Sequence, residues 1–320
     1  MKKATLLLTI LLGISAITGI KAAQTESTSS SALPQRIFAP YVDVCAWPIY
    51  NLTDIFEKTG QKYYTLAFIV ADNSSPTSEE PCFGGYAAYS VTGHHYMDQI
   101  KYIRSKGGDV IVSFGGAINT PIAARITNLD RLVAAYQKVI DTYSLKWIDF
   151  DIEAGWVSDQ VSIDHRNKAA KILQDNNPDL QIAYCLPVMP SGLLDNAVSI
   201  LANAVQNGVR IDCVNIMTMD YGKGGNMGQN AINAMNALFS QLQGIYQEAG
   251  INKTAAEIWG MIGATPMTAT NDTGEFFSTD DAQNVLSFAN QHNIKLLSMW
   301  SVNRENSKYE YTNIFKQFTQ

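Results

Sequence analysis

Three carboxylates stand at strict two-residue spacing within residues 147–153, which read Trp-Ile-Asp-Phe-Asp-Ile-Glu. Side chains alternate between the two faces of a β-strand, so Asp149, Asp151 and Glu153 would share one face and the apolar residues the other. Close carboxyl groups cannot all ionise cheaply, so the three should titrate together, with one of them holding a proton near neutral pH. A positioned proton of this kind is what general acid catalysis requires. The alternative is an ordinary amphipathic strand whose charged face lies in water.

The elements that would position these residues alternate along the chain. Eight β-rich runs are expected to be strands, at residues 37–44, 63–70, 109–114, 147–152, 181–186, 213–219, 258–262 and 295–300. Amphipathic stretches are expected to be helices, at residues 96–105, 129–143, 163–176, 194–206, 231–248, 281–290 and 308–318. In the clearest of them, residues 129–143, the apolar side chains form one stripe, and Asn128 is the expected N-terminal cap.

This alternation predicts an α/β fold, a single (β/α)8 TIM barrel. Several strands are nearly continuous in apolar residues, which is typical of a parallel sheet covered by helices. No Gly-x-Gly-x-x-Gly turn follows the first strand, which argues against a dinucleotide-binding sheet. Both faces of a barrel strand are covered, so three carboxylates on one face would be buried at considerable cost unless they are paired or protonated. The barrel therefore disfavours the solvated strand and places Glu153 at the C-terminal mouth, where the active sites of such barrels lie.

Three other predicted strands end in distinctive residues. Residues 113–116 read Ser-Phe-Gly-Gly at the third strand, 217–222 read Met-Thr-Met-Asp-Tyr-Gly at the sixth, and 298–301 read Ser-Met-Trp-Ser at the eighth. Together with the Asp-x-Asp-x-Glu motif that ends at Glu153, they resemble the family 18 glycoside hydrolases, the chitinase family, over nearly the whole predicted domain. The resemblance implies retaining hydrolysis of β-1,4-linked N-acetylglucosamine polymers, with the acetamide group of the substrate as the nucleophile.

The resemblance also implies a role for each residue. Glu153 would protonate the glycosidic oxygen, Asp151 would hydrogen-bond the acetamide N–H, and Asp149 would share a proton beneath them. Tyr221 would donate to the acetamide carbonyl, and Trp300 would form an aromatic floor under the reacting sugar. The remaining substrate-binding candidates lie at the same strand ends: Asp220, Met219, Met217, Gly115 and Gly116. The two glycines are expected to permit close approach rather than to act in catalysis.

The sequence departs from the family pattern in two places. An Asp that usually stands three residues before the first Asp of the motif is replaced by Lys146, which is expected to lie at the base of the strand with structural consequences only. The usual Met-x-Tyr-Asp of the sixth strand appears either without its Tyr, ending at Asp220, or without its Asp, ending at Tyr221. Which of these two residues contacts the acetamide stays open at this point.

The segment 264–280 is too short for the α+β subdomain that larger members of the family insert after the seventh strand. That subdomain makes one wall of a deep groove. The cleft of this chain is therefore expected to be shallow and open, which favours endo action or a broad range of chito-oligosaccharides over processive cleavage.

Composition limits the other classes of function. The chain has 320 residues, of which 46% are hydrophobic, and this is enough for a full core. Its formal net charge of −6 argues against a nucleic-acid partner, because phosphate binding needs a basic surface. The histidines show no spacing typical of a zinc site, no P-loop is present, and Ser113 is not in a Gly-x-Ser-x-Gly turn; the histidines are His94, His95, His165 and His292. No metal ion and no cofactor are expected.

The four cysteines are expected to fall into two groups. Cys45 and Cys82 follow predicted strands, where loops gather at one end of the barrel, and they are the preferred disulfide pair. Cys185 and Cys213 lie within apolar strand runs, so they are expected to be buried free thiols.

The N-terminal residues are typical of a secretory signal peptide. Two lysines precede an apolar stretch and then small residues, which predicts a signal peptide at residues 1–22. A Ser- and Thr-rich disordered linker is expected at residues 23–35, followed by the catalytic domain at residues 36–320. The alternative is a membrane anchor, for which the apolar stretch is short. The mature protein is expected to be secreted, without a membrane span, and to act as a monomer on chitin or chito-oligosaccharides.

Two other functions remain open at the level of sequence. A sugar-binding lectin could keep the same fold and aromatic cleft, but such proteins typically lack the acid that Glu153 supplies here. An endo-β-N-acetylglucosaminidase that cuts the chitobiose core of N-glycans would use the same residues. Product release from chito-oligosaccharides, compared with glycan release from a glycoprotein, separates hydrolysis of N-acetylglucosamine polymers from this second hydrolase activity.

Overall fold

The structure, a computed structural model, describes residues 1, 33–222 and 224–319. Almost all of the predicted signal peptide and most of the predicted linker lie outside the described residues. Within the part of the chain that is described, no helix is both long enough and apolar enough to cross a bilayer.

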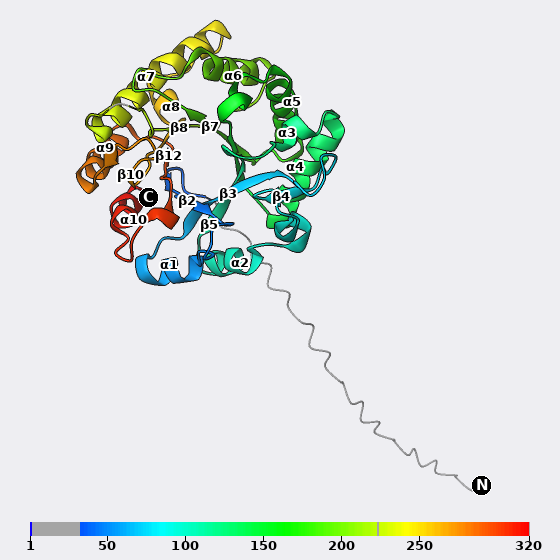
Figure 1. Ribbon diagram of the computed structural model, residues 1–320. Helices are drawn as coiled ribbons and strands as arrows, with labels where there is room; N and C mark the ends of the chain where they lie inside the picture. Colours follow the sequence, from blue (N-terminus) through cyan, green and yellow to red (C-terminus); the bar gives the residue numbers. More distant parts are fainter. Residues whose placement is uncertain (2–32, 223, 320) are drawn as a thin grey trace.

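Parallel strands form a closed barrel at the centre of the fold (Figure 1). In spatial order they are β1 (Ile37–Phe38), β12 (Leu296–Leu297), β9 (Ile262–Thr265), β8 (Cys213–Met217), β7 (Gln181–Pro187), β6 (Trp147–Asp151), β5 (Asp109–Gly115), β3 (Tyr63–Ala71) and β2 (Tyr41–Asp43). The strands β1 and β2 are two halves of one predicted strand, interrupted around Pro40, which has no N–H to donate. Because β1 pairs with β12 and β2 pairs with β3, this segment closes the barrel. The predicted barrel is confirmed.

Helices surround the strands in a ring (Figure 1). They are α1 (Leu52–Thr59), α2 (Met97–Ser105), α3 (Ile122–Arg125), α4 (Leu129–Tyr143), α5 (Gln160–Asn176), α6 (Asp195–Gln206), α7 (Met227–Glu248), α8 (Ala255–Trp259), α9 (Thr279–His292) and α10 (Glu310–Phe315). The predicted cap of α4 is confirmed, since the side-chain oxygen of Asn128 accepts a hydrogen bond from the Arg131 N–H at 3.0 Å.

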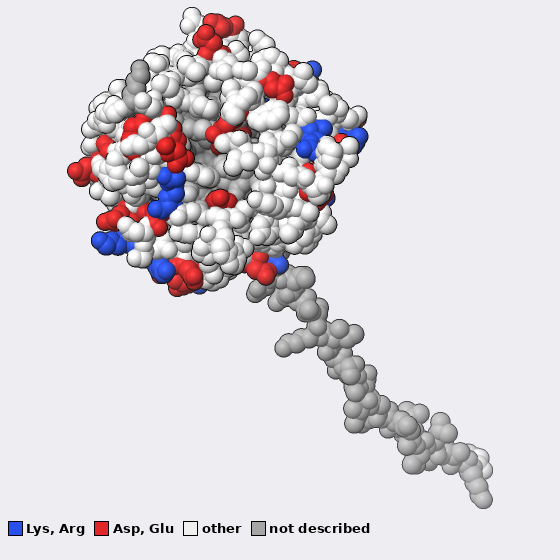
Figure 2. Space-filling model, viewed as in Figure 1, with Lys and Arg blue, Asp and Glu red and all other residues white. Residues whose placement is uncertain are grey.

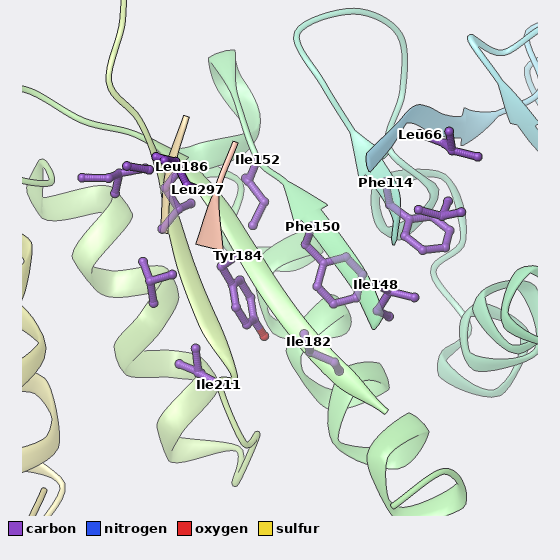
Figure 3. Close-up of a cluster of buried hydrophobic side chains, with 14 of the residues drawn as sticks. Leu66, Phe114, Ile148, Phe150, Ile152, Ile182, Tyr184, Leu186, Ile211 and Leu297 are labelled. Carbon is purple, nitrogen blue, oxygen red and sulfur yellow. The ribbon is translucent and has the colours of Figure 1, made fainter. Parts of the chain in front are cut away.

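The main hydrophobic core lies between the strands and the helices (Figure 3). The apolar residues of β6 and its extension, Ile148, Phe150 and Ile152, all belong to this layer and are almost fully buried. The Phe150 ring centroid lies 5.3 Å from that of Tyr136 on α4 and 5.8 Å from that of Tyr184 on β7. With this face of β6 fixed against the helices, the alternate face must point into the barrel.

The structure corrects several predicted element boundaries. The seventh strand was placed at residues 258–262, but Ile258 lies in α8 and the strand β9 starts at Ile262. The cause is a capping box in which Thr254 and Glu257 hydrogen-bond each other's backbone and so start a short helix. The sixth strand, β8, ends at Met217 rather than at residue 219, and α1 was not predicted.

The segment 264–280 contains only a small hairpin, β10 (Ala269–Thr270) paired with β11 (Phe276–Phe277). A further short strand, β4 (Pro81–Phe83), pairs antiparallel with β3 and is not one of the barrel strands. The expected lack of a subdomain after the seventh strand is therefore confirmed for this segment.

The predicted disulfide is wrong. All four cysteines are free, and both Cys185 and Cys213 are buried as expected. Cys45 lines the central cleft, whereas Cys82 is fully buried near the charges of Asp72 and Lys138. The two thiols lie in different surroundings, because Cys45 follows β2 whereas Cys82 lies within β4, paired with Val70 of β3.

Candidate active site

The three carboxylates are arranged by depth along one face of β6. Asp149 is 2% exposed and Asp151 is 5% exposed, while Glu153 is partly exposed two residues beyond the end of the strand. Ionisable side chains buried to this degree are not a solvated face. The amphipathic-strand alternative is therefore excluded.

Asp149 is held by a network that crosses the barrel interior. Its Oδ2 accepts a hydrogen bond from the Tyr41 hydroxyl at 2.8 Å and another from the Ser113 hydroxyl at 2.6 Å. The Asn215 side-chain amide donates to the Tyr41 oxygen at 3.2 Å, and the Thr265 hydroxyl donates to Asn215 Oδ1 at 2.8 Å. Five strands thus contribute one polar side chain each, which fixes the orientation of Asp149.

Sequence reasoning did not identify Tyr41 and Asn215 as site residues. The available signal was a fully buried polar residue inside an apolar strand, as in the run Cys-Val-Asn-Ile-Met of β8. A buried amide needs hydrogen-bond partners, so such a residue points to a polar network even when its role is unknown.

Burial raises the pKa of all three carboxyl groups. The pKa of Asp149 is raised to about 6 by burial, although the hydrogen bonds from Ser113 and Tyr41 oppose the shift. The pKa of Asp151 is raised well above its usual range by burial and then by the nearby charge of Glu153. Burial also raises the pKa of Glu153, and the charge of Asp220 adds to this effect. The cluster therefore retains at least one proton more readily than isolated carboxyl groups.

Glu153 opens into a cleft of about 570 Å³ at the C-terminal end of the barrel. Figure 2 shows a hollow near the centre of the molecule, with acidic side chains beside it. Five carboxylates line the cleft, and no lysine or arginine of the described residues does: Asp43, Asp151, Glu153, Asp220 and Asp272. A polyanionic ligand would be repelled by this lining, whereas a neutral sugar would not.

Aromatic side chains form the floor of the cleft. Trp300 stacks on Phe68, with ring centroids 5.4 Å apart and ring planes 17° from parallel. Tyr41 contacts both rings, at 6.0 Å from Trp300 and 5.9 Å from Phe68. All three residues line the cleft, together with Met217 and Met219. A broad apolar floor beside carboxylates suits the C–H face of a pyranose ring.

Asp220 and Tyr221, the two candidates that follow β8, lie in different places in the structure. Asp220 lines the cleft; its backbone has a φ of 52°, and its carboxylate accepts hydrogen bonds from the N–H and hydroxyl of Thr273, at 3.1 and 3.2 Å. Tyr221 does not line the cleft but is 6% exposed within the main core. The left-handed turn at Asp220 directs the two neighbouring side chains differently. The buried Tyr221 hydroxyl has no hydrogen-bond partner among the described residues, and its role as a donor to the acetamide stays a prediction.

The two glycines at the end of β5, Gly115 and Gly116, are required by close approach of neighbouring atoms. A Cβ on Gly115 would lie 1.9 Å from the carbonyl oxygen of Asp151, and a Cβ on Gly116 would lie 2.7 Å from the Phe68 ring. Both residues have positive φ, of 115° and 86°. The Gly116 N–H also donates to the Asp151 carbonyl at 3.2 Å. These glycines therefore position β6 and the cleft floor.

We expect Gly115→Ala to destabilise the fold by roughly 2–3 kcal/mol, because the added methyl group overlaps the backbone of Asp151 and the φ of 115° is strained for alanine. Urea unfolding followed by circular dichroism measures the change. Gly244→Ala in the interior of α7 is the matched control, since, apart from its chain neighbours and the backbone of its own helix, no atom of the described residues lies within 4 Å of the added Cβ. That control should be neutral or stabilising. Equal stability of the two variants would contradict the role given to Gly115.

Asp149 and Asp151 also lie near a thiol, in a group of side chains that could hold a metal ion. Among the described residues, ligand atoms of Asp149, Asp151 and Cys185 lie within 4.8 Å of one another. Asp149 already accepts two hydrogen bonds, and burial raises the pKa of the Cys185 thiol well above its usual range, which favours the protonated form. The cluster is therefore interpreted as a proton-holding group.

Two curated proteins are similar to this chain, whereas no family model matches it. The chain is 36% identical over 326 residues to a probable bifunctional chitinase/lysozyme of Escherichia coli (strain K12), covering 92% of this chain and 36% of that protein. It is 37% identical over 293 residues to Endochitinase 11 of Metarhizium anisopliae, covering 87% of this chain and 54% of that protein. The chain thus spans about a third and about half of the length of these relatives.

A similar solved structure is matched over nearly the full length of both chains. Active domain 2 of the chitinase from Pyrococcus furiosus is 34% identical and superimposes with a TM-score of 0.81, covering 90% of this chain and 96% of that domain. Catalytic-site mutants of the same domain have been determined in complex with chito-oligosaccharides, with the same identity and coverage.

Proposed function

The chain belongs to the family 18 glycoside hydrolases, and we propose that it hydrolyses β-1,4 linkages between N-acetylglucosamine units of chitin or chito-oligosaccharides. The chitinase domain of Pyrococcus furiosus, which the chain matches over nearly the full length of both, supports this proposal. One observation carries the proposal: a partly exposed Glu153 stands at the cleft above two buried carboxylates of the same strand face. No basic side chain of the described residues lines this cleft, in keeping with a neutral sugar polymer.

The proposed mechanism uses the substrate as its own nucleophile. A conventional retaining glycosidase places its acid and its nucleophile about 5–5.5 Å apart on opposite sides of the bond. Asp151 and Glu153 come from one face of one strand, so they cannot straddle a sugar ring. The acetamide carbonyl of the sugar on the non-reducing side attacks the anomeric carbon instead, while Glu153 gives its proton to the glycosidic oxygen. The bond between the anomeric carbon and the glycosidic oxygen breaks, and the leaving sugar departs with that proton. Water then attacks the anomeric carbon of the oxazolinium ion and gives one of its protons to the Glu153 carboxylate, which restores the acid and frees the acetamide.

Asp151 is proposed to bind the acetamide N–H and to stabilise the positive charge that develops on this group. Asp149 lies one step deeper and is proposed to share a proton with Asp151. The Oδ1 atoms of both aspartates are buried without a hydrogen-bond partner among the described residues, which suits a proton held between the two groups. When Asp151 turns towards the substrate, Tyr41 and Ser113 stabilise the negative charge left on Asp149.

Asp220 is the proposed partner for the acetamide or for an adjacent hydroxyl group of the sugar. It lines the cleft, it is fixed by Thr273, and its charge acts on Glu153. A raised pKa of Glu153 keeps the acid protonated to higher pH, which is the state that its role requires.

We expect the protein to release soluble sugars from chito-oligosaccharides, with internal bonds cut first because the cleft lacks a wall built after the seventh strand. Time-resolved chromatography of products from a hexasaccharide measures the order of cleavage. Release of disaccharide alone from insoluble polymer, from the first minutes onward, contradicts endo action. Release of glycans from a glycoprotein without cleavage of chito-oligosaccharides supports the endo-β-N-acetylglucosaminidase alternative, and binding without cleavage supports a lectin.

We also propose that the enzyme acts outside the cytoplasm as a monomer. The support is the sequence pattern of a basic start, an apolar stretch and small residues before position 23. The substrate class agrees with this location, because an insoluble polymer cannot enter a cell.

A further inference from the structure

Exposed apolar side chains are concentrated at one end of the barrel. Besides the terminal Met1, eight large apolar side chains of the described residues are exposed. Seven of them lie between the end of a barrel strand and the next helix, or at the start of that helix: Trp47, Ile49, Tyr86, Ile118, Val161, Leu194 and Phe276. In a βα barrel these segments form the C-terminal face, which is also the face of the cleft. The eighth, Ile251, follows α7 and lies at the opposite end.

Single exposed apolar residues are common on soluble proteins and need no explanation. The distribution over the two ends of the barrel is the unusual feature. Two of the seven, Tyr86 and Ile118, line the cleft and are 58% and 74% exposed. They come from the connections after the second and third barrel strands, so they stand on one side of the cleft mouth.

Trp47 is the most exposed of the seven side chains and lies in the connection after the first barrel strand. Its side chain is 89% exposed, and it follows Asp43 and Cys45, which both line the cleft. An indole of this size would normally be buried against its own domain, because burial of its apolar surface is favourable. Here the ring stands in solvent, two residues along the chain from Cys45 of the cleft lining.

The loop that carries Trp47 is fixed on both sides. Before the indole, the Val44 N–H donates to the Ala67 carbonyl at 3.3 Å, and a ring nitrogen of His95 lies 3.2 Å from the Val44 carbonyl. After it, the Tyr50 hydroxyl donates to the Asn303 carbonyl at 3.2 Å. The exposed ring is therefore held on an anchored loop, and binding through it requires little additional ordering of the backbone.

We propose that the catalytic face docks on the surface of insoluble chitin, with Trp47 as its main contact outside the cleft and with Tyr86 and Ile118 linking that contact to the cleft. This inference rests on the proposed function. The apolar faces of pyranose rings and the acetamide methyl groups of a chitin surface offer partners to an exposed indole. The contact would hold the enzyme beside the polymer while one chain enters the cleft.

The test compares Trp47→Ala with Ile251→Ala, an exposed apolar residue at the other end of the barrel, both in the Glu153→Gln background so that the polymer is not consumed. We expect Trp47→Ala to weaken binding to insoluble chitin by about tenfold, the effect of losing one aromatic stacking contact. Ile251→Ala should bind like its parent, and Trp47→Tyr should retain most of the affinity. Equal losses in the two alanine variants, or no loss in either, would overturn the proposal.

A second measurement separates docking from a sugar subsite inside the cleft. With Glu153 intact, the loss of activity of Trp47→Ala on insoluble chitin should exceed its loss of kcat/KM on a soluble trisaccharide by about tenfold. Equal losses on both substrates would place Trp47 in the cleft and overturn the docking role. If the parent enzyme cleaves neither substrate, the proposed function fails, and that outcome is distinct from equal cleavage by parent and variant, which refutes only the role of Trp47.

Discussion

Glu153→Gln is expected to fold like the parent protein and to lose roughly 10²–10⁴-fold in kcat on chito-oligosaccharides. Glutamine keeps the size and the hydrogen-bonding capacity of the side chain but has no proton to give to the leaving oxygen. The side chain is partly exposed beyond the end of β6, so the change removes no buried packing. Steady-state kinetics on a soluble oligosaccharide, together with a thermal unfolding curve, measures both parts of the prediction.

Lys146→Ala is the control for this experiment. Lys146 directly precedes β6 at the end of the barrel opposite the cleft, and its backbone carbonyl accepts a hydrogen bond from the Gln181 N–H at 2.9 Å. The substitution keeps that bond, so kcat should change little. Turnover of Glu153→Gln close to that of the parent, or loss of activity in a folded Lys146→Ala, would show that the motif has been assigned to the wrong residues.

The barrel could be predicted from the sequence because its signal is repeated. Each strand run and each helical stripe is a weak indication, but eight alternations leave few other folds, and strict spacing fixes which face of β6 is acidic. The element boundaries that were predicted wrongly depend on single local contacts. At α8, one capping interaction between Thr254 and Glu257 outweighs the β-propensity of Ile258, and apolar periodicity does not register such a contact.

The candidate site was predictable only in part, for a related reason. The carboxylates of β6 are adjacent in sequence, so their shared face follows from the period of a strand. Tyr41 reaches Asp149 across 108 positions of sequence, and Asn215 reaches Tyr41 across 174, so these contacts depend on closure of the barrel. The direction of the side chains at Asp220 and Tyr221 depends on one backbone angle, which the sequence does not specify.

Asp151→Asn is expected to separate activity from stability. Activity should fall by roughly 10²–10³-fold, the usual effect of removing one group that stabilises developing charge in a closed site. Folding should become more favourable at neutral pH, because burial and the charge of Glu153 raise the pKa of Asp151 in the folded protein. A carboxyl group whose pKa is raised on folding contributes stability below its unfolded pKa, near 3.8, and this contribution is lost as pH rises through the folded value. Asparagine does not ionise and avoids that loss.

The free energy of unfolding from urea titrations, measured between about pH 4 and pH 8, tests this argument. The stability of Asp151→Asn minus that of the parent should rise with pH, and the activity should stay low throughout. Asp179→Asn is the matched control for the loss of one carboxylate, because this exposed side chain lies at the opposite end of the barrel, just before β7, and its activity should match that of the parent. A stability difference for Asp151→Asn that does not change with pH would mean that Asp151 ionises freely in the folded protein. In that case Asp151 would hold no proton near neutral pH, and the proton-sharing role given to it and Asp149 would have to be abandoned.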